Sequence, residues 1–136
     1  MDKRYTYEGV ELAYSVEGEG DALLLLHGWG CDRNIWKATA EVLRHHFMVV
    51  AVDFAGFGKS QEPREVWGVE EYTRSIEALV KELGVVRPIV VGHSFGGRVS
   101  ILSRGWDALT RTSTSSLSLR LTMWLSQRSL WRSIPT

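Results

Sequence analysis

The chain alternates short apolar runs with glycine-rich loops and amphipathic segments. The apolar runs cover residues 22–26, 47–52 and 88–91, and each ends at a polar residue or a glycine. Continuous apolar runs of this length are typical of strands that are buried on both faces of a parallel sheet. The pattern therefore predicts three buried strands.

Amphipathic segments follow these runs and predict helices. Residues 69–83 are the clearest case, because apolar side chains recur at steps of three and four and Gly84 can cap the C-terminus. A second helix is expected over residues 32–43, with Ile35 near its apolar face, and a third is expected to begin at residue 95.

The N-terminal residues have the pattern of a hairpin. Residues 5–7 and 11–17 are predicted to be strands around a turn at Glu8-Gly9. The later rhythm of strand, helix, strand, helix, strand requires βαβ crossovers. We therefore expect the α/β class, with a doubly wound and mainly parallel sheet.

One segment carries a recognisable chemical motif. Residues 92–96 read GHSFG, which fits G-x-S-x-G between a predicted strand and a predicted helix. This motif makes a sharp turn that projects the serine oxygen, and its glycines avoid collisions with neighbouring backbone. The helix N-terminus directs its positive end toward developing negative charge. Ser94 is therefore a candidate nucleophile.

Two further motifs stand upstream, and the three together resemble the α/β-hydrolase fold family. Residues 27–30 (HGWG) resemble the family's oxyanion loop, and residues 53–60 (DFAGFGKS) resemble its D-x-x-G-x-G-x-S loop. The resemblance covers roughly residues 4–103 and implies the N-terminal half of that fold. Its motif positions are His27, Gly28, Trp29, Gly30, Asp53, Gly56, Gly58, Gly92, His93, Ser94, Phe95 and Gly96.

The resemblance implies a role for particular residues. Ser94 matches the nucleophile, and the backbone N–H groups of Trp29 and Phe95 match the two oxyanion donors. His27 and Asp53 are expected to fix their loops by hydrogen bonds. Serine at the elbow, where haloalkane dehalogenases and epoxide hydrolases carry aspartate, implies a carboxylesterase-like serine hydrolase. Its substrate would be a small ester, thioester, amide or similar carbonyl compound.

The sequence also departs from the family pattern. The family places an acid and then a histidine after the serine, but no histidine follows His93 and Asp107 is the only later acid. We therefore expect a chain that is catalytically incomplete and inactive alone. The division expected is a partial α/β-hydrolase domain at 1–103 and an atypical, poorly ordered tail at 104–136.

The composition of the tail motivates that division. Residues 104–136 contain seven Ser, five Thr and five Arg, with no continuous aliphatic run. A doubly wound sheet needs further buried strands. We interpret the tail as the product of a reading-frame shift or a similar truncation after about residue 103.

Two other classes of function remain open. Residues 58–60 (GKS) resemble the end of a Walker A loop, which would indicate a nucleotide-binding protein. That motif requires glycine where Asp53 stands, and a carboxylate there would repel phosphate. The second alternative is a non-catalytic fragment or binding module.

Composition excludes several partners. The formal net charge is zero, so nothing favours nucleic acid or an anionic membrane. The single cysteine, Cys31, allows no internal disulfide, and no apolar segment approaches the roughly 20 residues of a membrane span. We expect a cytoplasmic protein with no cofactor and no metal; nothing indicates its oligomeric state.

Overall fold

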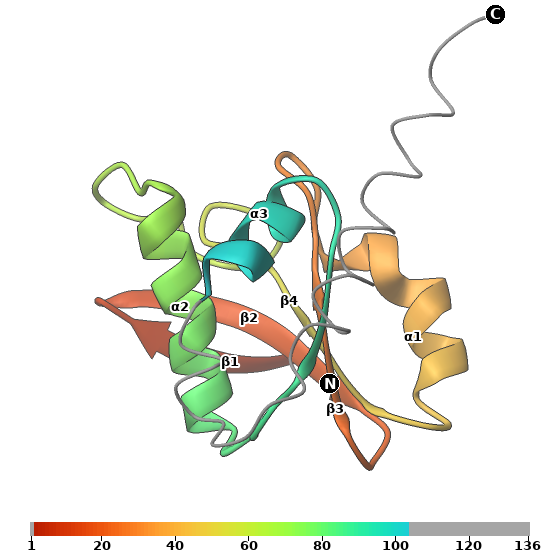
Figure 1. Ribbon diagram of the computed structural model, residues 1–136. Coiled ribbons are helices and arrows are strands. Elements are labelled where there is room, and N and C mark those ends of the chain that lie inside the picture. Colours follow the sequence, from red (N-terminus) through yellow and green to blue (C-terminus); the bar gives the residue numbers. More distant parts are fainter. Residues whose placement is uncertain (1, 104–136) are drawn as a thin grey trace, which may run out of the picture.

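The computed structural model describes residues 2–103, in which one sheet lies between helices (Figure 1). The five strands follow the order β1-β2-β4-β3-β5 across the sheet. The strands are β1 (Asp2–Tyr7), β2 (Val10–Glu17), β3 (Ala22–Leu26), β4 (Met48–Val52) and β5 (Ile89–Gly92). The helices are η1 (Arg33–Trp36, a 3-10 turn), α1 (Lys37–Leu43), α2 (Val69–Glu82) and α3 (Phe95–Leu102).

The pairing of the strands confirms the predicted fold class. β3 lies parallel to both β4 and β5, whereas β2 is antiparallel to β1 and β4. Figure 1 shows α1 on one side of the sheet and α2 and α3 on the other. The described residues therefore form a doubly wound, mixed sheet in which the parallel strands occupy one half.

The alternation of side chains along β3 separates two cores. Leu24 and Leu26 pack into the cluster that includes α2 and α3, while Leu23 and Leu25 pack into the cluster on the α1 side. All four side chains are buried. A strand covered on both faces needs no polar alternation, which explains its continuous apolar run.

The hairpin is confirmed, and its first strand is longer than predicted. Glu8 and Gly9 both have positive φ, +48° and +74°, as in a two-residue turn whose twist matches the strands. The hairpin also reaches α2, because the buried Tyr5 hydroxyl donates a hydrogen bond of 3.0 Å to the Ser75 carbonyl. Burial raises the pKa of Tyr5.

The predicted helix over residues 32–43 is wrong in detail. The segment begins as the 3-10 turn η1, in which the Asp32 carboxylate accepts a hydrogen bond of 2.8 Å from the Asn34 N–H, and becomes α-helical only at α1. A 3-10 turn advances three residues per turn, so it shifts the phase of the apolar stripe. Ile35 is consequently 45% exposed and does not face the core.

The prediction for residues 88–91 also needs correction. The strand forms, but Ile89, Val90 and Val91 are only half-buried. The reason is position, since β5 stands at the end of the strand order within residues 2–103. The predicted tail at 104–136 lies outside the described residues.

Across residues 2–103, none of the helices combines the length and apolarity that a bilayer crossing requires.

The core assignment predicts unequal costs for two isoleucines. Ile76 on α2 is fully buried, so Ile76→Ala should lower the free energy of unfolding by about 2–5 kcal/mol. The matched variant Ile35→Ala removes a half-exposed side chain and should cost less than about 1 kcal/mol. Denaturant titration of both variants measures the difference. Equal costs would show that this packing is misassigned.

Candidate active site

Ser94 occupies the turn between β5 and α3. Its φ and ψ are +52° and −111°, and α3 begins at the next residue. A positive φ is unusual for serine and strains the backbone, which is typical of a nucleophile elbow. The Ser94 side chain is exposed, and its carbonyl accepts N–H bonds from Gly97 and Arg98.

Two glycines make this turn possible. A Cβ atom on Gly92 would lie 2.4 Å from the backbone of Gly96. A Cβ on Gly96 would lie 2.3 Å from the Leu26 carbonyl oxygen. Both distances are shorter than any real contact, so α3 can start this close to β3 only with glycine at each position.

The same approach places the turn beside the HGWG loop. The His93 N–H donates to the Leu26 carbonyl at 2.9 Å, and a Cβ on Gly28 would lie 2.8 Å from His93 Nδ1. The Trp29 and Phe95 rings are in edge contact, with centroids 5.3 Å apart. The structure thus brings Ser94 and the two predicted oxyanion residues together.

His27 connects the HGWG loop to the loop after β4. Its Nδ1 lies 2.7 Å from the Gly28 carbonyl, and its Nε2 lies 2.9 Å from the Phe54 N–H. Because a backbone N–H can only donate, Nε2 must be the acceptor and Nδ1 must carry the proton. Burial of this neutral ring lowers the pKa of His27.

The carboxylate of Asp53, the first residue of the D-x-x-G-x-G-x-S loop, holds that loop by hydrogen bonds. The carboxylate is buried; Oδ1 accepts the Arg33 N–H at 2.8 Å and Oδ2 accepts the Lys59 N–H at 3.0 Å. Arg33 Nε lies 3.5 Å from Oδ2. Gly58 has φ +53°, and a Cβ there would meet the carboxylate at 2.4 Å. This hydrogen-bonding role is the one expected for Asp53.

The remaining predicted glycines have simpler geometry. Gly30 and Gly56 both have positive φ, +76° and +84°. A Cβ on Gly30 would meet nothing within 4 Å, so its requirement is conformational and not steric.

Sequence reasoning missed the residues that join these loops. Arg33 was not singled out, although its side chain is only 9% exposed and reaches both Asp53 and Asp2. Phe57 was also missed, although its ring contacts Trp29 and His27 at 4.8 and 5.8 Å. No local pattern signals these contacts, because their partners are distant along the chain.

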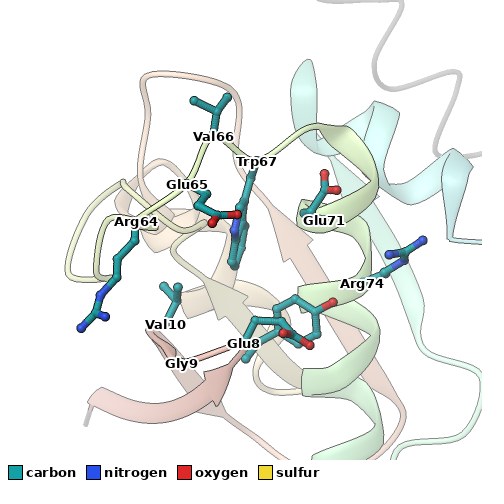
Figure 2. Close-up of a pocket in the computed structure, with 10 residues that line it drawn as sticks. Glu8, Gly9, Val10, Arg64, Glu65, Val66, Trp67, Glu71 and Arg74 are labelled. Carbon is teal, nitrogen blue, oxygen red and sulfur yellow. The ribbon is translucent and has the colours of Figure 1, made fainter.

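A cavity lies elsewhere in the described part. It has a volume of about 670 Å³ and lies between the β1–β2 turn, residues 64–67 and α2, with Trp67 as one wall (Figure 2). None of its lining residues belongs to the three motifs. Within residues 2–103, no three His, Cys, Asp or Glu side chains are grouped so as to hold a metal ion.

Comparison with known proteins identifies the family. The family model for the alpha/beta hydrolase fold matches residues 21–102. These residues include all three motifs and every parallel strand. The chain therefore belongs to the alpha/beta hydrolase fold family, as the motifs indicated.

Individual relatives differ in their chemistry. A pimeloyl-[acyl-carrier protein] methyl ester esterase of Aliivibrio fischeri is 45% identical over 89 residues, covering 65% of this chain and 33% of that protein. A soluble epoxide hydrolase of Corynebacterium sp. is 33% identical over 92 residues, covering 68% of this chain and 32% of that protein. The chain spans about a third or less of the length of the curated relatives it matches.

Solved structures agree with the fold. A thermophilic esterase from Thermogutta terrifontis superimposes with a TM-score of 0.69 at 32% identity, covering 76% of this chain and 40% of that structure.

The steric argument predicts a large effect at Gly96. Gly96→Ala places a methyl group against the Leu26 carbonyl and should destabilise the fold by more than about 3 kcal/mol, because the backbone must move. Gly30→Ala is the control, since it meets only conformational strain of about 1–2 kcal/mol. Thermal unfolding distinguishes the two, and a milder effect at Gly96 would contradict the close approach.

The His27 hydrogen bonds predict a pH dependence of stability. The folded state holds His27 neutral, so its pKa lies below the usual 6.5. As the pH falls below 6.5, the unfolded state binds a proton first, and the free energy of unfolding should decrease by up to about 1.4 kcal/mol per pH unit. The decrease continues until the pH reaches the folded pKa.

Two glutamine variants test this pH dependence. His27→Gln can keep both hydrogen bonds and should lose the His27 contribution to the slope. The exposed His46 provides the control, because His46→Gln should retain the His27 contribution to the slope of unfolding free energy against pH. Identical slopes in His27→Gln and the unmodified chain would show that His27 is not held neutral.

Proposed function

We propose that this chain is part of a serine hydrolase that acts on an ester, thioester, amide or similar carbonyl compound, with Ser94 as the nucleophile. The observation that carries the proposal is the strained, exposed position of Ser94 beside the HGWG loop. The esterase relatives support the same chemistry.

The proposed oxyanion donors are the N–H groups of Trp29 and Phe95. Within residues 2–103, neither N–H donates to a protein acceptor. In the reaction, Ser94 Oγ bonds to the carbonyl carbon, its proton passes to a base, and the carbonyl oxygen becomes an oxyanion. Two donors aimed at that oxygen each lower the barrier by about 3 kcal/mol. The intermediate then expels the leaving group, and water releases the acyl group.

The residue at the elbow separates this proposal from epoxide opening. The relatives include epoxide hydrolases, but position 94 of this chain is serine, not aspartate. A serine hydroxyl needs a base and an oxyanion hole, which suits attack on a carbonyl carbon. We therefore attribute the similarity to epoxide hydrolases to the shared fold and not to a shared reaction.

The loop at residues 53–60 argues against nucleotide binding. A phosphate cradle needs free backbone N–H groups and a free hydroxyl. The Lys59 N–H is bonded to Asp53, and the Ser60 hydroxyl donates to the Asp53 carbonyl while accepting from Ala13. The buried Asp53 carboxylate already lies where a nucleotide phosphate would have to bind.

None of the histidines is placed to activate Ser94. Both ring nitrogens of His27 are engaged, and His93 directly precedes Ser94 with its ring packed toward Gly28. His45 and His46 precede β4, so they lie at the opposite end of the parallel strands from Ser94. We therefore propose that the 136-residue chain is a poor catalyst alone.

The division at about residue 103 and the frame-shift origin of the tail stay predictions, as does a cytoplasmic location. The partner proposed is a small carbonyl substrate, with no cofactor.

Ester hydrolysis tests catalytic completeness. The unmodified chain should hydrolyse a p-nitrophenyl ester about 10⁶-fold more slowly than a complete serine hydrolase, because loss of the base costs roughly that factor in kcat. Ser94→Ala should change this residual rate little. Turnover at ordinary enzyme rates that Ser94→Ala abolishes would overturn the proposal of incompleteness.

Covalent labelling tests the nucleophile itself. In alkaline buffer, where hydroxide can remove the serine proton, a fluorophosphonate should label Ser94 faster than any other serine, because its oxygen enters the oxyanion hole. Peptide mapping by mass spectrometry locates the adduct, and Ser94→Ala is the control. Labelling spread evenly over exposed serines would refute the assignment.

A further inference from the structure

The HGWG loop is contacted at three successive points by one other segment, residues 53–60. At the first residue of the loop, His27 Nε2 accepts the Phe54 N–H at 2.9 Å. Within the loop, the Trp29 ring lies against the Phe57 ring, with centroids 4.8 Å apart. After the loop, the Arg33 N–H donates to Asp53 Oδ1 at 2.8 Å.

The Trp29 ring also makes edge contacts with Phe95 and Tyr72, at centroid distances of 5.3 and 5.9 Å, but its backbone is held by few hydrogen bonds. Its own N–H has no acceptor within residues 2–103, and the nearest loop bond is a turn in which the Cys31 N–H donates to the Gly28 carbonyl at 3.1 Å. Gly30 beside it has a positive φ of +76°. A short turn of this kind lacks the repeated backbone hydrogen bonds of a helix or a sheet. Its position therefore depends on contacts made by its side chains and by the residues on either side of it.

The contacting segment is itself firmly held. The Asp53 N–H donates to the Ala13 carbonyl at 2.9 Å, and the Gln61 N–H donates to the Glu11 carbonyl at 2.8 Å. The segment is thus fastened to β2 at both ends. The Asp53 carboxylate, whose side chain is 2% exposed, closes it internally through Lys59 and ties it to Arg33.

We propose that residues 53–60 are the template that positions the Trp29 N–H, with Asp53 and Phe57 as positioning residues for the oxyanion donor. Asp53 acts through Arg33 at the far end of the turn, and Phe57 acts through the Trp29 ring. Neither touches the substrate. This inference rests on the proposed function for its chemical meaning, because Trp29 needs a fixed position only if its N–H receives an oxyanion.

Some residues at this segment bond to β2, and others contact the HGWG loop and the residues that follow it. Ser60 and the following residue, Gln61, fasten the segment to β2: the Ser60 hydroxyl accepts the Ala13 N–H at 2.8 Å, and Gln61 Oε1 accepts the Glu11 N–H at 3.0 Å. Asp53 and Phe57 reach toward residues 27–33. The Ser60 hydroxyl also donates to the Asp53 carbonyl, so of Ser60 and Gln61 only Gln61, which follows the segment, can be altered without removing a bond to Asp53.

Order parameters from ¹⁵N relaxation of the full chain test the proposal. In the unmodified chain, the Trp29 amide should be rigid, with an order parameter of about 0.85. In Asp53→Asn, an amide group faces the Lys59 N–H and the charge that holds Arg33 is lost. The Trp29 order parameter should then fall below about 0.6, while amides in β3 stay rigid.

A matched control separates positioning from general destabilisation. Gln61→Ala removes the side-chain hydrogen bond from the Glu11 N–H, next to the same segment, and should lower the melting temperature while leaving the Trp29 order parameter unchanged. If Asp53→Asn does not fold, Phe57→Leu keeps an apolar side chain, removes the ring contacts with Trp29 and His27, and should loosen Trp29. A rigid Trp29 in each folded variant of Asp53 and Phe57 would overturn the proposal, as would equal loosening in Gln61→Ala.

Fluorophosphonate labelling of the same variants distinguishes the two claims. Phe57→Leu should label at Ser94 at least about tenfold more slowly than the unmodified chain, since a displaced donor stabilises the oxyanion poorly. An unmodified chain that does not label at Ser94 would reject the proposed function, while the order parameters would still decide whether residues 53–60 position Trp29.

Discussion

The close approach of the turn at Ser94 to the end of β3 is the constraint on which the site depends. Gly96 leaves no room for a side chain against the Leu26 carbonyl, and Gly92 leaves none against Gly96. With these two glycines, α3 begins directly above the sheet and Ser94 takes a positive φ. A methyl group at either position would separate the serine from the HGWG loop.

Two buried polar residues extend this arrangement to the neighbouring strand. His27 follows β3 and Asp53 follows β4, and parallel strands bring such ends to one edge of the sheet. His27 bonds to residue 54, and Asp53 bonds to residue 33. Each buried polar group is satisfied by a backbone N–H of the other loop, so the two loops fix one another at little cost in desolvation.

The sequence predicts features that arise from local pattern. The apolar run of β3, the periodicity of α2 and the motif at Ser94 all depend on residues close together in the chain, and all were located correctly. Ile35 was misplaced because the Asp32 cap starts a 3-10 turn, which periodicity alone does not reveal. The roles of Arg33 and Phe57 depend on contacts with segments about 20 or more residues away, so no local pattern carries them.

We propose that the fold of residues 2–103 by itself makes the Trp29 and Phe95 N–H groups converge. Two hydrogens that each lie about 2 Å from one oxygen are at most about 4 Å apart. A nuclear Overhauser effect between these two amide protons in the full chain measures that separation directly. The account predicts a clear cross-peak. Its absence, with both amides assigned and the β3–β5 cross-peaks present, would contradict the claim.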